Sequence, residues 1–127
     1  MSDKFTVEII SPDQTILQQE TNEVIIPSFE GQMGILNNHI PLITFLRPGI
    51  ITIKAESEKK YYAEEGTVEF SNNNLLILTS TARDLVNFDK SKIHEMLHKV
   101  EAHLNTEISD KDRYVASYKL ETLKEIS

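Results

Sequence analysis

The sharpest pattern of chemically competent residues is His94-Glu95-Met96-Leu97-His98. On a helix the two imidazoles would lie one turn apart and could share a zinc ion, with Glu95 as general base, as in the H-E-x-x-H zinc peptidases. Glu121, on a later predicted helix, could be drawn as a third ligand. However, Glu101 stands where the longer three-histidine motif needs glycine. The two histidines also lie largely on the side of the helix opposite its apolar stripe, so they are expected to face water. A solvated helix face is therefore the favoured interpretation.

No other residue set suggests an enzyme. No serine stands in the G-x-S-x-G setting of a nucleophile elbow, and Gly31-Gln32-Met33-Gly34 is too short for a phosphate-binding loop. The chain has no cysteine, which removes thiolate metal sites and cysteine nucleophiles. We therefore predict a binding or structural module with no catalytic residue, no metal ligand and no cofactor.

The charge balance limits the partners. The 127 residues carry 13 Lys and Arg against 20 Asp and Glu, a formal net charge of −7. A surface this acidic repels phosphate backbones and anionic lipid headgroups, which argues against nucleic acid as a partner. No apolar run is long enough to cross a bilayer, so direct lipid insertion is not expected either.

The predicted secondary structure divides the chain into two parts. All four glycines and all four prolines lie before residue 67, among short β-rich runs that predict an antiparallel β-sandwich over residues 1–86. The expected strands cover residues 5–10, 22–27, 40–46, 50–54, 60–64, 67–71 and 75–79. A hairpin is expected around Gly66, and Asn72-Asn73-Asn74 predicts another, because Asn tolerates positive φ.

Residues 87–127 predict an antiparallel two-helix hairpin, which makes the fold α+β and mainly β. Asp89 or Ser91 can cap the first helix, and Ser109 with Asp112 resembles a capping box for the second. The apolar positions share one stripe on each helix: Ile93, Met96, Leu97, Val100 and Leu104, then Val115, Ala116, Leu120, Leu123 and Ile126. The burial of so few apolar side chains cannot offset the conformational entropy lost when both helices become ordered. The hairpin must therefore pack against the sandwich or against another chain.

Residues that match a family signature are most concentrated in Val24-Ile25-Ile26-Pro27-Ser28-Phe29-Glu30-Gly31-Gln32-Met33-Gly34-Ile35-Leu36, continued by Asn37-Asn38-His39-Ile40-Pro41-Leu42-Ile43-Thr44-Phe45-Leu46-Arg47-Pro48-Gly49. This stretch closely resembles the signature of the epsilon subunit family of bacterial F-type ATP synthase, called delta in mitochondria. That family shows Pro, Gly-x-x-Gly-Ile-Leu, His-x-Pro-Leu and Leu-x-Pro-Gly in this order. Here Ser28 and Asn37-Asn38 replace a family Gly and Pro-Gly, and Asn suits such turns.

The resemblance implies a non-catalytic subunit of the central stalk in the F1 part of a rotary motor. Such a subunit packs against gamma and touches the c-ring, so that proton flow through the membrane sector is coupled to ATP synthesis. The family's ring-facing positions are carried here by a loop of Glu30, Gly31 and Gln32, together with Ser11 and His39. For His39, the sequence leaves open the alternative of a turn residue satisfied by backbone groups.

The resemblance also implies a regulatory tail. In many bacterial members the helices extend along gamma, reach the alpha and beta catalytic subunits and block ATP hydrolysis; a quietly docked hairpin is the open alternative. Some members bind ATP through Ile/Leu-Asp-x-x-Arg-Ala, which corresponds here to residues 88–93. Asp89 is retained, but Lys92 replaces the planar Arg fork with a point charge, so these candidate nucleotide-binding residues form an altered motif.

Two further expectations follow. The start of the chain is unlike a transit peptide, which favours a bacterial protein held peripherally on the cytoplasmic side of the inner (plasma) membrane. A free-standing β-sandwich adaptor or ligand-binding module is the alternative function, and it would need no stalk partner.

Overall fold

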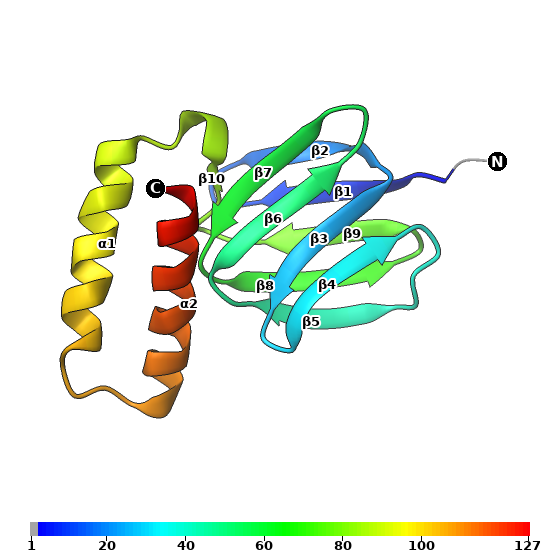
Figure 1. The fold of residues 1–127 in the computed structure, drawn as a ribbon. Coiled ribbons are helices and arrows are strands. Elements are labelled where there is room, and N and C mark those ends of the chain that lie inside the picture. The colour runs from blue at the N-terminus through cyan, green and yellow to red at the C-terminus, as the bar shows by residue number, and fades with distance from the viewer. Residues whose placement is uncertain (1–2) are drawn as a thin grey trace.

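The computed structural model describes residues 3–127, and Figure 1 shows a sandwich of strands with a two-helix hairpin beside one end. This confirms the expected fold class. The strands are β1 (Phe5–Ile10), β2 (Thr15–Thr21), β3 (Glu23–Ser28), β4 (Gly31–Leu36), β5 (Leu42–Leu46), β6 (Gly49–Lys54), β7 (Glu58–Ala63), β8 (Gly66–Ser71), β9 (Asn74–Leu78) and β10 (Arg83–Asp84). A 3-10 turn, η1 (Leu85–Asn87), leads to α1 (Lys90–Leu104) and α2 (Asp110–Ile126).

The strands follow the order β10-β7-β6-β3-β5-β8-β9-β1-β2, with β4 paired to β3 off this path. The pairing of β3 with β5 is confined to Ser28 opposite Leu46, so the sheet folds over at this point into two layers. The recorded pairs are antiparallel except that of β1 with β9, which run parallel from Thr6 beside Asn74. The antiparallel expectation therefore holds with one exception.

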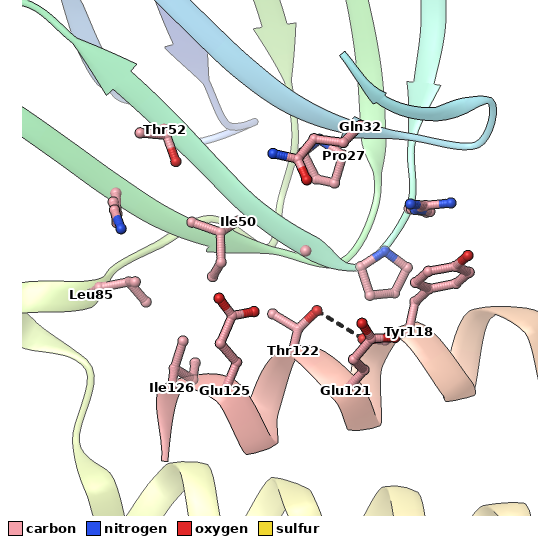
Figure 2. A pocket seen from close by; sticks show the side chains of 14 residues that line it. Pro27, Gln32, Ile50, Thr52, Leu85, Tyr118, Glu121, Thr122, Glu125 and Ile126 are labelled. Atoms are coloured by element: carbon pink, nitrogen blue, oxygen red, sulfur yellow. Dashed lines mark hydrogen bonds between the residues drawn. The ribbon is translucent and has the colours of Figure 1, made fainter. Parts of the chain in front are cut away.

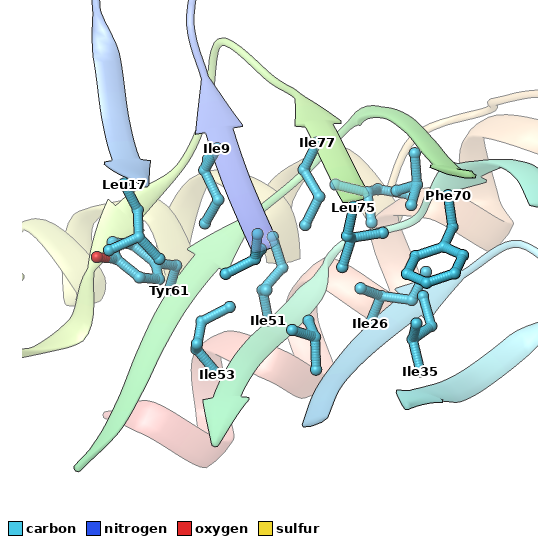
Figure 3. Packing of buried hydrophobic residues seen from close by; sticks show 14 of the residues in the cluster. Ile9, Leu17, Ile26, Ile35, Ile51, Ile53, Tyr61, Phe70, Leu75 and Ile77 are labelled. Atoms are coloured by element: carbon cyan, nitrogen blue, oxygen red, sulfur yellow. The ribbon is translucent and has the colours of Figure 1, made fainter. Parts of the chain in front are cut away.

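The core lies between the two layers. Figure 3 shows Ile9, Leu75 and Ile77 from β1 and β9 facing Ile51 and Ile53 from β6. Along these strands buried and less buried residues alternate, as in β1, because successive side chains point to opposite faces. The sequence of each strand thus supplies one apolar face, and stacking the two faces removes both from water.

The turns show which local predictions were correct. Asn72 and Asn73 adopt φ of 50° and 54°, which confirms the hairpin between β8 and β9. Asn38 also has positive φ, at 63°, in the position where the family signature has a glycine. The hairpin predicted around Gly66 is wrong, because β7 and β8 are not neighbours; this turn instead passes the chain from one layer to the other.

Among the described residues, three strands were not predicted from the sequence: β2, β4 and the two-residue β10. β2 carries Gln18, Gln19 and Glu20, and these polar residues interrupt the alternation of apolar and polar side chains that would indicate a strand. β4 begins at Gly31, so Gly31 and Gln32 start a strand that pairs with β3, and only Phe29 and Glu30 form the turn. The two glycines of β4 lower its apparent β-propensity, and pairing with β3 overrides that local signal.

Both helices begin where predicted. The Asp89 side chain caps α1 by accepting from the Ser91 N–H, and the Ser109 hydroxyl caps α2 by accepting from the Asp112 N–H. The predicted stripes meet in a second, smaller core that includes Val100, Ala116 and Leu123 and extends to Tyr62 and Ile50 of the sandwich. The hairpin is thus docked on the sandwich in this structure, with α2 against β6.

Within residues 3–127, no helix combines the length and the apolar composition that crossing a bilayer would require.

Candidate functional site

The turn between β3 and β4 is the most tightly pinned of the predicted contact positions. The buried Ser28 hydroxyl donates to the Gly31 carbonyl at 2.7 Å and accepts from the Glu30 N–H at 3.2 Å. Gly31 adopts φ of +123°, which side chains rarely tolerate, so the glycine is needed here. These bonds hold Glu30 exposed at the tip of a turn with a fixed shape.

The predicted ring-facing residues do not all lie at one end of the sandwich. Ser28 pairs with Leu46, and Leu46 pairs with Gly66, so these residues lie at the end of the sandwich that carries the β3–β4 turn. On β9 and β1, Leu78 pairs with Ile10, and Ser11 follows Ile10 at this same end. His39 lies at the opposite end, in the loop between β4 and β5. The structure therefore brings Ser11 and Glu30 to one end and separates His39 from both.

Ser11 and His39 each make the contacts of a turn residue. The Ser11 hydroxyl donates to the Gln14 carbonyl at 3.1 Å and accepts from the Gln14 N–H at 3.3 Å. The ring of His39 lies edge-on to Phe70 with centroids 5.8 Å apart, and its Nδ1 is 2.8 Å from the Ile40 carbonyl oxygen. Both side chains therefore shape loops, whatever they contact outside the chain.

Gln32 faces the helices. It lines a cavity of about 410 Å³ between the sandwich and α2. Figure 2 shows Gln32 on the sandwich side, opposite Glu121 and Glu125 of α2. Of the three residues predicted for one loop, Glu30 lies at the tip of the turn and Gln32 lies at the sandwich–helix boundary.

An exposed apolar surface was missed by the sequence analysis. Ile43 and Phe45 point out of β5 with 73% and 58% of their surface exposed, and Leu78 on β9 is 45% exposed. The register forms a row of Phe45, Thr67 and Leu78 across three strands. Leu36 and Ile40 are also exposed, but Leu36 shares its face of β4 with Gln32, which lies at the boundary with the helices. The signal was present in Leu42-Ile43-Thr44-Phe45-Leu46, where four of the five residues are apolar although only one face of the strand can be buried.

The candidate nucleotide residues lie together at the start of α1. Asp89 and Lys92 line a cavity of about 230 Å³ with Arg83 and Phe88. The two hydrogen bonds from Ser91, from its N–H and its hydroxyl, hold the pKa of the Asp89 carboxyl below its usual value. Lys92 lies 3.9 Å from Glu95. The sequence suggested no role for Arg83, whose guanidinium carbon lies 5.2 Å from the Phe88 ring centroid.

The histidine motif lies on the exposed side of α1. His94, Glu95 and His98 are all exposed. The Glu95 carboxylate lies 3.2 Å from Lys99, and this contact, together with Lys92, holds the pKa of Glu95 below its usual value. Among residues 3–127 no three His, Asp or Glu side chains come together as a metal site would need. Glu95 is thus paired with two lysines of the same helix.

Comparison with known proteins gives a consistent result. The family model for the β-sandwich domain of the ATP synthase delta/epsilon chain matches residues 4–84. The chain is 45% identical over 130 residues to the ATP synthase epsilon chain of Pelagibacter ubique (strain HTCC1062), with 100% of both chains covered. It is 33% identical over 117 residues to the chloroplastic ATP synthase epsilon chain of Pyropia yezoensis, with 91% of this chain and 87% of the relative covered.

A solved structure is also similar. A chain in the Euglena gracilis mitochondrial ATP synthase, OSCP/F1/c-ring, superposes with a TM-score of 0.80, covering 98% of this chain and 82% of that one. The two sequences are 23% identical, so this likeness shows a shared fold that includes the helical hairpin as well as the sandwich.

Proposed function

The chain belongs to the family of ATP synthase epsilon chains, which are non-catalytic subunits of the central stalk, and we propose that it couples ion flow to ATP synthesis by joining gamma to the c-ring. The observation that carries this proposal is the full-length match to an epsilon chain at 45% identity, which spans both the sandwich and the helices. In this role the sandwich binds the stalk and the helical hairpin is a regulatory tail. The protein is held peripherally at the cytoplasmic side of the bacterial inner membrane through its partners.

Gamma is the proposed occupant of the exposed apolar surface formed by Ile43, Phe45 and Leu78. Exposed apolar side chains that gather on one surface commonly mark an interaction site. A stalk subunit that transmits torque needs an interface that excludes water, and aromatic and aliphatic side chains supply most of the energy of such interfaces. Phe45 lies within this surface, in one row with Leu78, which favours it as the anchor.

The c-ring is the proposed partner of the β3–β4 turn. Glu30 is exposed at its tip, and the Ser28 and Gly31 bonds give the turn a fixed shape. A rigid polar tip suits contact with the polar loops of a ring, because little conformational entropy is lost on binding. Ser11 lies at the same end of the sandwich and extends this contact, whereas His39 belongs to the opposite end.

The hairpin is the proposed inhibitor of ATP hydrolysis, acting on the alpha and beta subunits when it leaves the sandwich. Its core has fewer buried than half-buried side chains, which suits a segment that exchanges between partners. Asp89, Lys92 and the adjacent Arg83 are the residues through which a nucleotide would influence this exchange. Asp89 already caps α1, so nucleotide contact there would compete with the cap.

The test is a pull-down of the tagged chain from bacterial membranes. We expect gamma, followed by the catalytic subunits, to co-purify with the native chain. Phe45→Lys should abolish this, because it places a charge in the proposed interface. Val86→Lys is the matched control, since Val86 is 90% exposed but lies away from this surface, beside the helices. Recovery of the native chain alone, under conditions that preserve the motor, would overturn the proposal and favour a free-standing adaptor.

A second arm tests the tail. Removal of residues 88–127 should leave gamma binding intact and raise ATP hydrolysis by the isolated complex. Unchanged hydrolysis would show that the hairpin is not inhibitory, while the stalk assignment would stand.

A further inference from the structure

Four side chains join the sandwich to α2 at the β3–β4 turn. Tyr114 and Tyr118 lie one helical turn apart on α2, with ring centroids 4.9 Å apart. The Arg47 guanidinium carbon lies 3.8 Å from the centroid of the Tyr118 ring, within the range of a cation–π contact. The Phe29 ring stacks on Tyr114 at 5.6 Å with an interplanar angle of 15°. We call Phe29, Arg47, Tyr114 and Tyr118 the clasp.

The Tyr114 hydroxyl is the centre of the clasp. It accepts from the Arg47 guanidinium at 3.1 Å and donates to the Phe29 carbonyl oxygen at 3.1 Å. A single phenol thus connects the helix to the backbone of the turn and to the loop that follows β5. Phenylalanine at this position would keep the ring but leave the Phe29 carbonyl and Arg47 without this partner.

The clasp is built on the same backbone as the turn. Phe29 directly precedes Glu30, and its N–H donates to the Phe45 carbonyl at 3.1 Å while its own carbonyl accepts from Tyr114. Arg47 donates its backbone N–H to the Pro27 carbonyl at 3.0 Å. A displacement of the turn must therefore move the Phe29 carbonyl relative to α2, and it cannot do so while all of these bonds are kept.

A second attachment of α2 does not pass through the turn. Lys119 lies 3.2 Å from the Glu64 carboxylate, which also accepts from the Tyr62 hydroxyl at 2.9 Å. These residues connect α2 to the end of β7. The second attachment therefore provides an internal comparison, because it holds the same helix without touching Phe29 or Glu30.

We propose that the clasp couples the shape of the β3–β4 turn to the docking of the helical hairpin, so that a partner that displaces the turn weakens the hold on the tail. By linkage, release of the tail equally loosens the turn. That the displacing partner is the c-ring rests on the proposed function. The coupling between turn and tail is a property of the chain itself, and it is tested in the isolated full-length protein.

The first experiment alters the turn and observes the helix. Ser28→Ala removes both hydrogen bonds of the serine hydroxyl without changing any residue of the clasp. We expect amide hydrogen exchange in α2 to become about tenfold faster, while the core amides of β8 and β9 are unchanged. Asn73→Ala, which alters the turn at the opposite end of the sandwich, is the matched control and should leave α2 exchange as it is. Shifted turn resonances with unchanged α2 exchange would overturn the coupling.

The second experiment alters the helix and observes the turn. Tyr114→Phe should accelerate α2 exchange and shift the amide resonances of Glu30 and Gly31. Tyr118→Phe keeps the ring over Arg47 and should change neither. Lys119→Met should accelerate α2 exchange without shifting the turn resonances, because its attachment bypasses the turn. Equal effects of Tyr114→Phe and Lys119→Met on the turn would show that the clasp has no special connection to it.

The two proposals fail in distinguishable ways. If the isolated chain shows no coupling between the turn and the hairpin, the proposal for the clasp is overturned, while the proposal for partner binding is unaffected. Failure of gamma to co-purify overturns the stalk role, while the effect of Ser28→Ala on α2 exchange would remain.

Discussion

The sandwich and the helical hairpin bury their apolar side chains to different extents. Within residues 3–127, the core between the sheets contains sixteen buried hydrophobic residues with four half-buried ones packed against them. The core of the hairpin contains five buried residues, one of which is Tyr62 of the sandwich, and eight half-buried ones. The sandwich therefore forms its core from its own two layers, whereas the core of the hairpin includes a side chain of the sandwich.

The two regions are therefore expected to differ in the free energy needed to open them. Segments with few buried apolar contacts open at lower free energy than the global unfolding of the protein. The polar attachments of α2 add specificity to the docked position: the hydroxyl of Tyr62, whose pKa is raised by burial and by the neighbouring Glu64, bonds to the carboxylate that pairs with Lys119. The hairpin is thus held in one place but not deeply buried.

The largest effect is expected in the sandwich core. Leu75 is fully buried, and Leu75→Ala should lower the free energy of unfolding by about 2–5 kcal/mol, because it removes apolar burial and leaves a cavity. Leu78→Ala on the same strand, at a half-exposed position, should cost far less. Denaturant titration followed by the near-ultraviolet signal measures both. A similar loss for the two variants would contradict the assignment of the core.

The same substitution in α2 should have a local effect. Leu123 is also fully buried, and Leu123→Ala should destabilise the docked hairpin by about 2–4 kcal/mol. Hydrogen exchange should accelerate in α1 and α2 while β8 and β9 keep their rates. Lys124→Ala, one residue on and exposed, is the control. Equal acceleration in strands and helices would show that the two regions unfold as one cooperative unit.

A smaller effect is expected where the chain crosses between layers. Gly66 has φ of +155°, and a Cβ there would lie 2.5 Å from the Leu78 carbonyl oxygen. Gly66→Ala should therefore cost about 1–3 kcal/mol through strain and displacement of β9. Gly31→Ala shares the positive φ but meets nothing within 4 Å, so it should cost less. The difference in denaturation midpoint between the two variants isolates the steric contribution at Gly66.

Much of the fold was predictable because the decisive signals are local. The caps at Asp89 and Ser109 and the Asn72–Asn73 turn depend on residues within a few positions of one another. β4 and the passage at Gly66 were not, because their structure is decided by strands distant in sequence: β4 by pairing with β3, and the Gly66 turn by a strand order that keeps β7 and β8 apart.

The candidate site was predictable only in part, and for the same reason. The family signature pointed to Glu30 and Gly31, and in the structure Glu30 lies in the β3–β4 turn while Gly31 is the first residue of β4. No signature pointed to Tyr114 or Tyr118 as partners of Arg47, because a contact between residues 47 and 114 depends on how the hairpin docks. Nor could it show that Phe45 is exposed, since the strand is apolar on both faces and only the tertiary structure selects the buried one.

The smallest expected effect concerns acid and the helix caps. The pKa values of Asp89 and Glu95 are lowered in the folded state, so their contributions to stability are present above about pH 4 and are lost as the pH falls through the folded values. The hairpin should therefore lose helical content on acidification before the sandwich loses its strand signal. Asp89→Asn keeps a capping oxygen but cannot titrate, so it should reduce the acid sensitivity of α1. Circular dichroism between pH 7 and pH 3 measures the helix signal, and an unchanged pH profile in Asp89→Asn would place the acid sensitivity of the hairpin elsewhere.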